Sequence, residues 1–270
     1  MKIIRVRDIQ GIIYFAAEKE DGSALRIEGD IFGDYEVTED RLEVAKLLAP
    51  VVPSVFLCAG LNYRKHAEES GAKIPDYPVL FMKLPGTVQN PGDPIVLPRY
   101  LRSDEVDYEG ELAVVMAKPC KNVSRAAALD YVLGYTCAND VSARDWQIRR
   151  SGGQWCRSKS FDTFAPLGPR IVTFDEIPDP NSLQIKTLLN GEVVQDCNTN
   201  DMIFDVSALI EFLSASTTIP AGAVILTGTP HGVGFARKPQ LWMKPGDRVV
   251  VEIEKIGVLS NSVVEEAAAI

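Results

Sequence analysis

Four carboxylates recur at every second position of one short segment, residues 104–115, and apolar residues fill most of the positions between them. This period of two is the pattern of a β-strand. The acidic members are Glu105, Asp107, Glu109 and Glu111. On a strand they would share one face at spacings of about 7 Å, where like charges repel unless a cation lies between them. A hard divalent ion such as Mg²⁺ is the simplest such cation, and an acidic, solvent-exposed strand face is the alternative.

One of the two histidines has a carboxylate at helical spacing. His66 lies in the run GLNYRKHAEE, and Glu69 would face it about one helical turn later. Such a pair makes an oriented general base, although an exposed polar helix explains the same spacing. His231 lies in the run TGTPHGVG, whose glycines favour a tight turn or close approach to a ligand. His231 itself is expected to be a bystander.

Two more polar residues follow strand-like or aromatic runs. Asp140 ends GYTCAND, where its carboxylate could reach the acids of a neighbouring strand or cap a following helix. Lys159 lies in WCRSKSFD, and strand alternation would place it on the same face as Arg157. These cations would be partners for the acids or anion holders, and an ordinary salt bridge explains them equally well.

The elements that must position these residues are mostly strands. Strand-like runs occupy 54–58, 94–97, 106–116, 170–174, 184–189, 223–227 and 248–254, and helical patterns occur near 124–131 and 205–214. The first 50 residues show hairpin signals, with a short helix over 39–48, and Pro50 and Pro53 mark a boundary. We therefore predict an α+β, mostly β, protein with a small N-terminal domain at 1–52 and a main domain at 53–270.

Composition excludes several classes of protein. The chain has 270 residues, 46% of them hydrophobic, which suits one large domain or a main domain with a small appendage. The net charge of −9 argues against nucleic acid or an anionic membrane as the partner. The five cysteines are odd in number and form no CxxC pair, which favours reduced thiols. Without a signal peptide or a membrane-length apolar run, a soluble, cytoplasmic protein is expected.

Five motifs in order resemble the fumarylacetoacetate hydrolase family. They are GLNYRKHAEE, VDYEGELAVV, GYTCANDVSARDWQ, QWCRSKSFDTFAPLGP and LTGTPHGVG. The resemblance covers about residues 54–256 and implies a mixed β-sandwich roll catalytic domain with a small N-terminal domain, in a homodimer. The QWCRSKSFDTFAPLGP stretch looks most like members described as dienedioate isomerases or oxaloacetate-acting enzymes.

The resemblance also implies a metal centre. Glu109, Glu111 and Asp140 would be the ligands of one Mg²⁺, Mn²⁺ or Ca²⁺ ion, and Asp107 would support them from behind. A small-molecule 2-oxo acid would chelate the ion through a carboxylate oxygen and its keto oxygen. The ion would then stabilise an enolate formed when a C–C or C–H bond at C3 breaks.

Further residues would act on the substrate by the same resemblance. His66 and Glu69 would form a catalytic dyad on a segment that orders over the ligand, and Lys159 would polarise a substrate oxygen. Gln147 and Thr229 would line the pocket, and Arg144 lies near the site without a fixed role in the family.

The reaction expected first is hydrolysis of a C–C bond in an acylpyruvate-type 2-oxo acid. Oxaloacetate tautomerisation or decarboxylation, or isomerisation of 2-hydroxyhepta-2,4-diene-1,7-dioate, would use the same site. A catalytically silent, metal-stabilised binding protein would need neither the dyad nor Lys159. A two-metal phosphatase or nuclease is disfavoured by the few histidines and the lack of phosphate-binding motifs.

Overall fold

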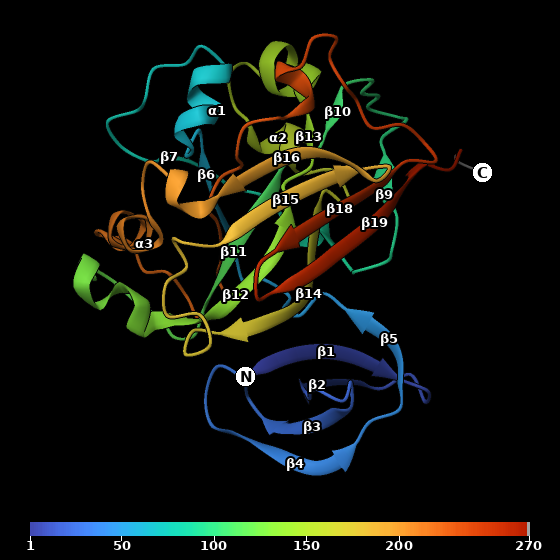
Figure 1. Ribbon diagram of the computed structural model, residues 1–270, viewed down its shortest axis with the longest axis vertical. Helices are drawn as coiled ribbons and strands as arrows, with labels where there is room; N and C mark the ends of the chain where they lie inside the picture. Colours follow the sequence, from blue (N-terminus) through green and yellow to red (C-terminus); the bar gives the residue numbers. More distant parts are fainter. Residues whose placement is uncertain (269–270) are drawn as a thin grey trace.

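The computed structural model describes residues 1–268, and its N-terminal strands gather at one end of the molecule (Figure 1). These strands are β1 (Lys2–Asp8), β2 (Ile13–Glu18), β3 (Ala24–Gly29), β4 (Tyr35–Arg41) and β5 (Val44–Leu48). The helix predicted over 39–48 is wrong. The reason is tertiary pairing: β4 bonds to β3 and β5 bonds to β1, so the backbone of both is used in a sheet.

One large sheet takes its strands from residues 2–226. Its main order is β4-β3-β2-β1-β14-β12-β11-β17-β6-β7, with β5 paired to β1 and β8 paired to β14. The later strands are β6 (Phe56–Gly60), β7 (Val79–Phe81), β8 (Val88–Gln89), β11 (Gly110–Met116), β12 (Val132–Asn139), β14 (Ala165–Thr173) and β17 (Val224–Leu226). The pairing of β1 with β14 joins the N-terminal strands to the rest.

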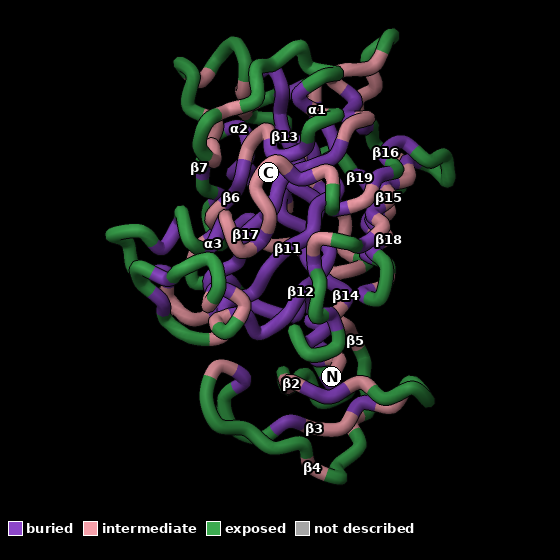
Figure 2. The backbone as a smooth tube through the Cα atoms, turned by 60° about the vertical axis from the view of Figure 1, so that its left-hand side comes forward, coloured by how far each residue is buried: buried purple, intermediate pink, exposed green. Residues whose placement is uncertain are grey.

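A smaller sheet covers one face of the large one and makes a sandwich. Its order is β16-β15-β18-β19-β9. Its strands are β9 (Ile95–Leu97), β15 (Gln184–Leu189), β16 (Glu192–Asn198), β18 (Arg248–Ile253) and β19 (Gly257–Glu265). Leu112 and Val114 of β11 belong to one buried cluster with Ile185 and Val251 of this sheet. Figure 2 shows buried residues along β11, β12 and β17, the strands at the centre of the molecule.

Helices are short and lie around the sheets. They are α1 (Arg64–Glu69), α2 (Cys156–Lys159) and α3 (Val206–Ser214), with 3₁₀ turns η1 (Pro85–Thr87), η2 (Arg125–Tyr131), η4 (Thr199–Asp201) and η5 (Gly234–Ala236) and a π turn, η3 (Trp146–Arg150). The α3 helix begins where Asp205 caps it by accepting from Ala208 N. It buries Leu209, Ile210 and Leu213 in the sandwich core. The helical segments predicted near 124–131 and 205–214 are therefore present.

The predicted fold class, α+β and mostly β, is confirmed, and its main error concerns the acidic segment. Residues 104–115 are not one strand: β10 (Val106–Asp107) pairs with β13 (Ser142–Ala143), and β11 starts only at Gly110. All five cysteines are free thiols. No helix among residues 1–268 has the length and apolar character of a membrane span. The domain boundary after residue 52 stays a prediction.

Candidate active site

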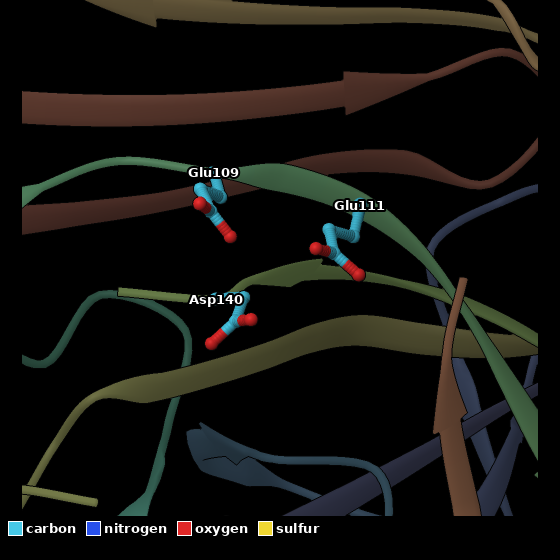
Figure 3. Close-up of side chains that lie close together, drawn as sticks. All are labelled: Glu109, Glu111 and Asp140. Carbon is cyan, nitrogen blue, oxygen red and sulfur yellow. The ribbon is translucent and has the colours of Figure 1, made fainter. Parts of the chain in front are cut away.

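The register of β11 against β12 brings three acids together. Gly110 pairs with Asn139, and Asp140 N donates to Glu109 O at 2.8 Å just beyond this pair. One ligand oxygen from each of Glu109, Glu111 and Asp140 lies within 4.8 Å of the other two, and all three residues are buried. Figure 3 shows Glu109 and Glu111 along one segment of the chain, with Asp140 on the neighbouring segment and near both.

Buried cations surround this acidic triad. Lys159 Nζ lies 2.7 Å from Glu109 Oε2 and 2.8 Å from Asp140 Oδ2, so it bridges two of the acids. Lys83 Nζ lies 2.6 Å from the other oxygen of Asp140. Arg144 pairs with Glu109 at 2.6 Å and with Asp107 at 2.9 Å. Asp107 also accepts from the backbone of the 234–235 turn, which fixes that turn at the site.

One acid lacks a cation of its own. Asp107, Glu109 and Asp140 each form an ion pair with Lys83, Arg144 or Lys159, whereas no ion pair to Glu111 is found among the described residues. Burial alone would raise the pKa of Glu109, but Lys159 and Arg144 outweigh it and hold that pKa at about 2. Burial, together with repulsion from Asp140 and Glu109, raises the pKa of Glu111 well above its usual value.

The triad fits a hard divalent cation. It offers three carboxylates, which are the donors that Mg²⁺, Mn²⁺ and Ca²⁺ take, in a buried place. The neighbouring lysines and arginine pair with Glu109 and Asp140, and no ion pair to Glu111 is found among the described residues. Glu111 is also held in place, because its Oε2 accepts from Gly228 N at 2.8 Å. These residues could therefore hold one divalent ion.

A histidine–carboxylate pair lies on α1. His66 Nδ1 lies 2.7 Å from Glu69 Oε1, so the expected contact is present. Glu69 is anchored in turn, because Gly232 N donates to its Oε2 at 2.9 Å. A carboxylate accepts only, so Nδ1 bears the ring hydrogen and Nε2 of the neutral ring is a free base. The chain thus fixes the tautomer that a general base needs.

Two acids of the triad and His66 line one cavity of about 350 Å³. Its charged and polar lining includes Glu109, Glu111, Lys159, His66, Arg144, Gln147 and Thr229. Apolar walls come from Phe81 and Trp155, whose rings pack edge to face at 5.6 Å, and from Ile148, Val233 and Phe235. Trp155 can lie there only because Gly60 has no side chain, since a Cβ at Gly60 would overlap the indole ring.

Of the other residues singled out from the sequence, some lie at the triad and others lie away from it. His231 is not among the residues that line the cavity, as expected. Glu105 lies away from the triad and pairs with Arg149 at 2.6 Å. The strand alternation proposed for Arg157 and Lys159 is wrong, because both lie on the short helix α2. Lys159 is buried against the triad, whereas Arg157 stacks over Phe161.

Sequence reasoning missed Lys83. It is 2% exposed, and its ammonium also lies 3.3 Å from Val141 O. A signal was available in the run VLFMKLP, where alternation continues from buried Phe81 past exposed Met82 to Lys83. A buried lysine requires an acid as partner, and Asp140 is that acid. Lys83 thereby completes the set of cations that hold the triad.

Comparison with known proteins agrees with this geometry. The model of the Fumarylacetoacetate (FAA) hydrolase C-terminal domain matches residues 55–264, and the model Rv2993c-like, N-terminal matches residues 1–50. The chain belongs to the fumarylacetoacetate hydrolase family. The protein is therefore an enzyme of a family whose members commonly use a divalent metal.

Relatives in this family include proteins named as tautomerases and isomerases. The human protein named Oxaloacetate tautomerase FAHD2A, mitochondrial, is 49% identical over 225 residues, which are 83% of this chain and 71% of the relative. The structure of 2-hydroxyhepta-2,4-diene-1,7-dioate isomerase from Mycobacterium marinum has a TM-score of 0.85 and 40% identity, covering 99% of this chain and 100% of that one. The 5-carboxymethyl-2-hydroxymuconate delta-isomerase structure from Mycobacterium smegmatis has a TM-score of 0.86 and 39% identity, covering 98% and 100%.

Proposed function

We propose that this protein is a divalent-metal-dependent tautomerase of oxaloacetate or a closely similar 2-oxo acid. The observation on which this rests is that one cavity is lined by Glu109 and Glu111 of the acidic triad, a buried lysine and an oriented histidine. The names of its family relatives favour proton transfer over bond cleavage. The cavity volume suits a substrate of a few carbon atoms.

The reaction moves one proton between C3 and the C2 oxygen of the 2-oxo acid. His66 is the residue that can hold this proton, because Glu69 keeps Nδ1–H engaged and leaves Nε2 free. Lys159 places an ammonium beside the triad, where it offsets negative charge that develops on the C2 oxygen. An ion held by Glu109, Glu111 and Asp140 would supply Lewis-acid stabilisation of the same charge.

Gln147 and Arg144 would orient the substrate, and Thr229 would line the cavity beside it. Gln147 and Arg144 are joined by a bond of 2.8 Å at the cavity wall, so Arg144 holds Gln147 as well as the acids. Thr229 lies on the opposite loop, the one that follows β17. Trp155 and Phe81 exclude water from one side of the cavity.

Hydrolysis of an acylpyruvate is the second candidate. The sequence predicts this reaction first, and the His66–Glu69 pair supports it because such a pair can also activate water. Decarboxylation of oxaloacetate would use the same groups. The homodimer and the cytoplasmic location stay predictions, and several relatives are named as mitochondrial.

The test follows the enol absorbance of oxaloacetate after metal loading with Mg²⁺ or Mn²⁺. A tautomerase removes this absorbance rapidly, without release of pyruvate. Metal-dependent release of pyruvate from acetylpyruvate would instead support the hydrolase. Pyruvate formed from oxaloacetate would support the decarboxylase, and no turnover across a panel of 2-oxo acids would contradict all three.

A further inference from the structure

The backbone of Gly110 lies at the centre of the triad and has no strand partner on one side. Gly110 separates Glu109 from Glu111, and β12 pairs with it on one edge. On the other edge, β17 pairs only with Ala113, Val114 and Val115, and Thr227 N adds one bond to Leu112 O. Beyond Leu112 the chain that follows β17 no longer pairs with the backbone of β11. The N–H and the C=O of Gly110 therefore need partners from elsewhere.

Gln195 of the smaller sheet supplies one of these partners. Its Oε1 accepts from Gly110 N at 2.9 Å, and its Nε2 donates to Pro230 O at 2.9 Å. An N–H donor at one end and a carbonyl at the other fix the amide orientation without ambiguity. The second hydrogen of Nε2 points to Thr229 Oγ1 at 2.8 Å. Gln195 is 1% exposed, so these bonds are shielded from bulk solvent.

The direction of the next bond follows from the first. Because Gln195 Nε2 can only donate, Thr229 Oγ1 accepts from it. The Thr229 hydroxyl therefore directs its own hydrogen to Gly110 O, which lies 3.1 Å away. Gln195 and Thr229 together replace the missing strand on this edge of Gly110. The hydroxyl hydrogen of Thr229 is thereby used within the protein and is not free for a substrate oxygen.

We propose that Gln195 is a positioning residue that fixes Glu109 and Glu111 relative to the Thr229–Pro230 segment of the cavity wall. This inference rests on the proposed function in one respect, since it takes the triad to be metal ligands. The ligands project from residues on either side of Gly110, so a small rotation of this peptide would move both carboxylates. Groups that orient metal ligands from behind commonly affect metal affinity about 10-fold to 100-fold.

The test is the Mn²⁺ affinity of the metal-free protein, measured by calorimetry. Gln195→Met keeps the length and volume of the side chain but removes all three bonds, and we expect its Mn²⁺ affinity to fall about 10-fold or more. The matched control is Thr187→Val. Thr187 lies opposite Gln195 on β15 and packs against Gly110, yet its hydroxyl has no hydrogen-bond partner among the described residues. This control should bind Mn²⁺ within about twofold of the parent.

Equal Mn²⁺ affinity in Gln195→Met and the parent would overturn the inference, and so would an equal loss in Thr187→Val. Circular dichroism checks that each variant is folded. If Gln195→Met does not fold, Thr229→Val carries the same comparison, because it removes only the bond to Gly110 O and the acceptor for Gln195. A parent that binds Mn²⁺ but leaves oxaloacetate unchanged would contradict the proposed function alone, since this test is scored on metal affinity.

Discussion

At the scale of single residues, Glu111 is the acid whose charge the protein leaves least compensated. Glu109 and Asp140 share Lys159, whereas Glu111 has the hydrogen bond from Gly228 N and no ion pair among the described residues. Its raised pKa reflects burial first and the neighbouring acids second. A divalent ion would remove this cost, so Glu111 should contribute strongly to metal affinity.

Replacing Glu111 by Gln should therefore remove both the metal and the activity. The amide keeps the size of the side chain and can still accept from Gly228 N. We expect Mn²⁺ affinity to fall by at least about tenfold, and turnover of oxaloacetate to fall with it. Glu105→Gln is the control, because Glu105 lies on the same segment but pairs with Arg149 outside the triad. Unchanged Mn²⁺ binding in Glu111→Gln would refute its role as a ligand.

The His66–Glu69 pair predicts a different result, loss of rate without loss of metal. His66→Ala should lower kcat by about 10²-fold to 10⁴-fold, because the imidazole that Glu69 orients is removed from the cavity. Mn²⁺ affinity should stay near that of the parent, since His66 is not in the triad. His231→Ala serves as the control. Steady-state kinetics on oxaloacetate and on acetylpyruvate would show which reaction depends on His66, and parental rates on both would exclude the dyad.

At the scale of elements, sequence patterns located most strands and failed where a chain segment changes partner. The runs at 184–189, 223–227 and 248–254 match β15, β17 and β18 closely, because alternation and apolar content are local signals. The acidic segment breaks at Tyr108 and Glu109 because β10 leaves for β13 while β11 joins β12. No local pattern encodes such a change of partner.

The same contrast between local and long-range signals decides which residues of the candidate site could be predicted from the sequence. Spacing pointed to four acids on one segment and to His66 with Glu69, and the resemblance to the family then selected Glu109, Glu111 and Asp140. Lys83 and Gln195 were not found, because their importance comes from long-range contacts with Asp140 and Gly110. The helix α2 replaced an expected strand for a similar reason: four residues are too few for periodicity to discriminate.

The junction between β6 and the loop before α2 makes a prediction about the cavity wall. In Gly60→Ala the new Cβ would overlap the ring of Trp155, which must then leave its place beside Phe81. We expect kcat/KM to fall about tenfold or more, because the wall that positions the substrate moves. Tryptophan fluorescence should shift in the same variant. Gly86→Ala is the control, since nothing lies within 4 Å of its Cβ position, and equal effects in both would reject the explanation.

At the scale of the whole molecule, the N-terminal strands extend the central sheet at a distance from the site. Ile3, Ala17 and Ile27 belong to the same buried cluster as Leu167 and Ile171 of β14. Figure 1 shows α1 and α2 at the end opposite these strands. The large sheet thus connects an N-terminal module that packs on β14 to a site built at the far ends of β11 and β12.

The buried acids also couple global stability to pH and metal. The pKa of Glu111 is raised by burial and by its acidic neighbours, and burial raises the pKa of Asp107 despite Arg144. A group with a raised folded-state pKa contributes its stability below the unfolded pKa and loses it as pH rises through the folded one. Glu109 has a lowered folded-state pKa of about 2, so its contribution to stability is lost as pH falls. That loss is confined to pH values below about 4.5.

The free energy of unfolding of the metal-free protein should therefore decrease as pH rises from about 5 to about 8. Saturating Mn²⁺ should reduce this dependence, because the ion favours the ionised form of Glu111 in the folded state and raises stability by mass action. Urea denaturation in EDTA and in Mn²⁺ across this pH range measures both effects. Glu111→Gln should flatten the metal-free profile, because its side chain has no proton to lose. A metal-free parent whose stability rises with pH over the same range would contradict the charge balance deduced for the triad.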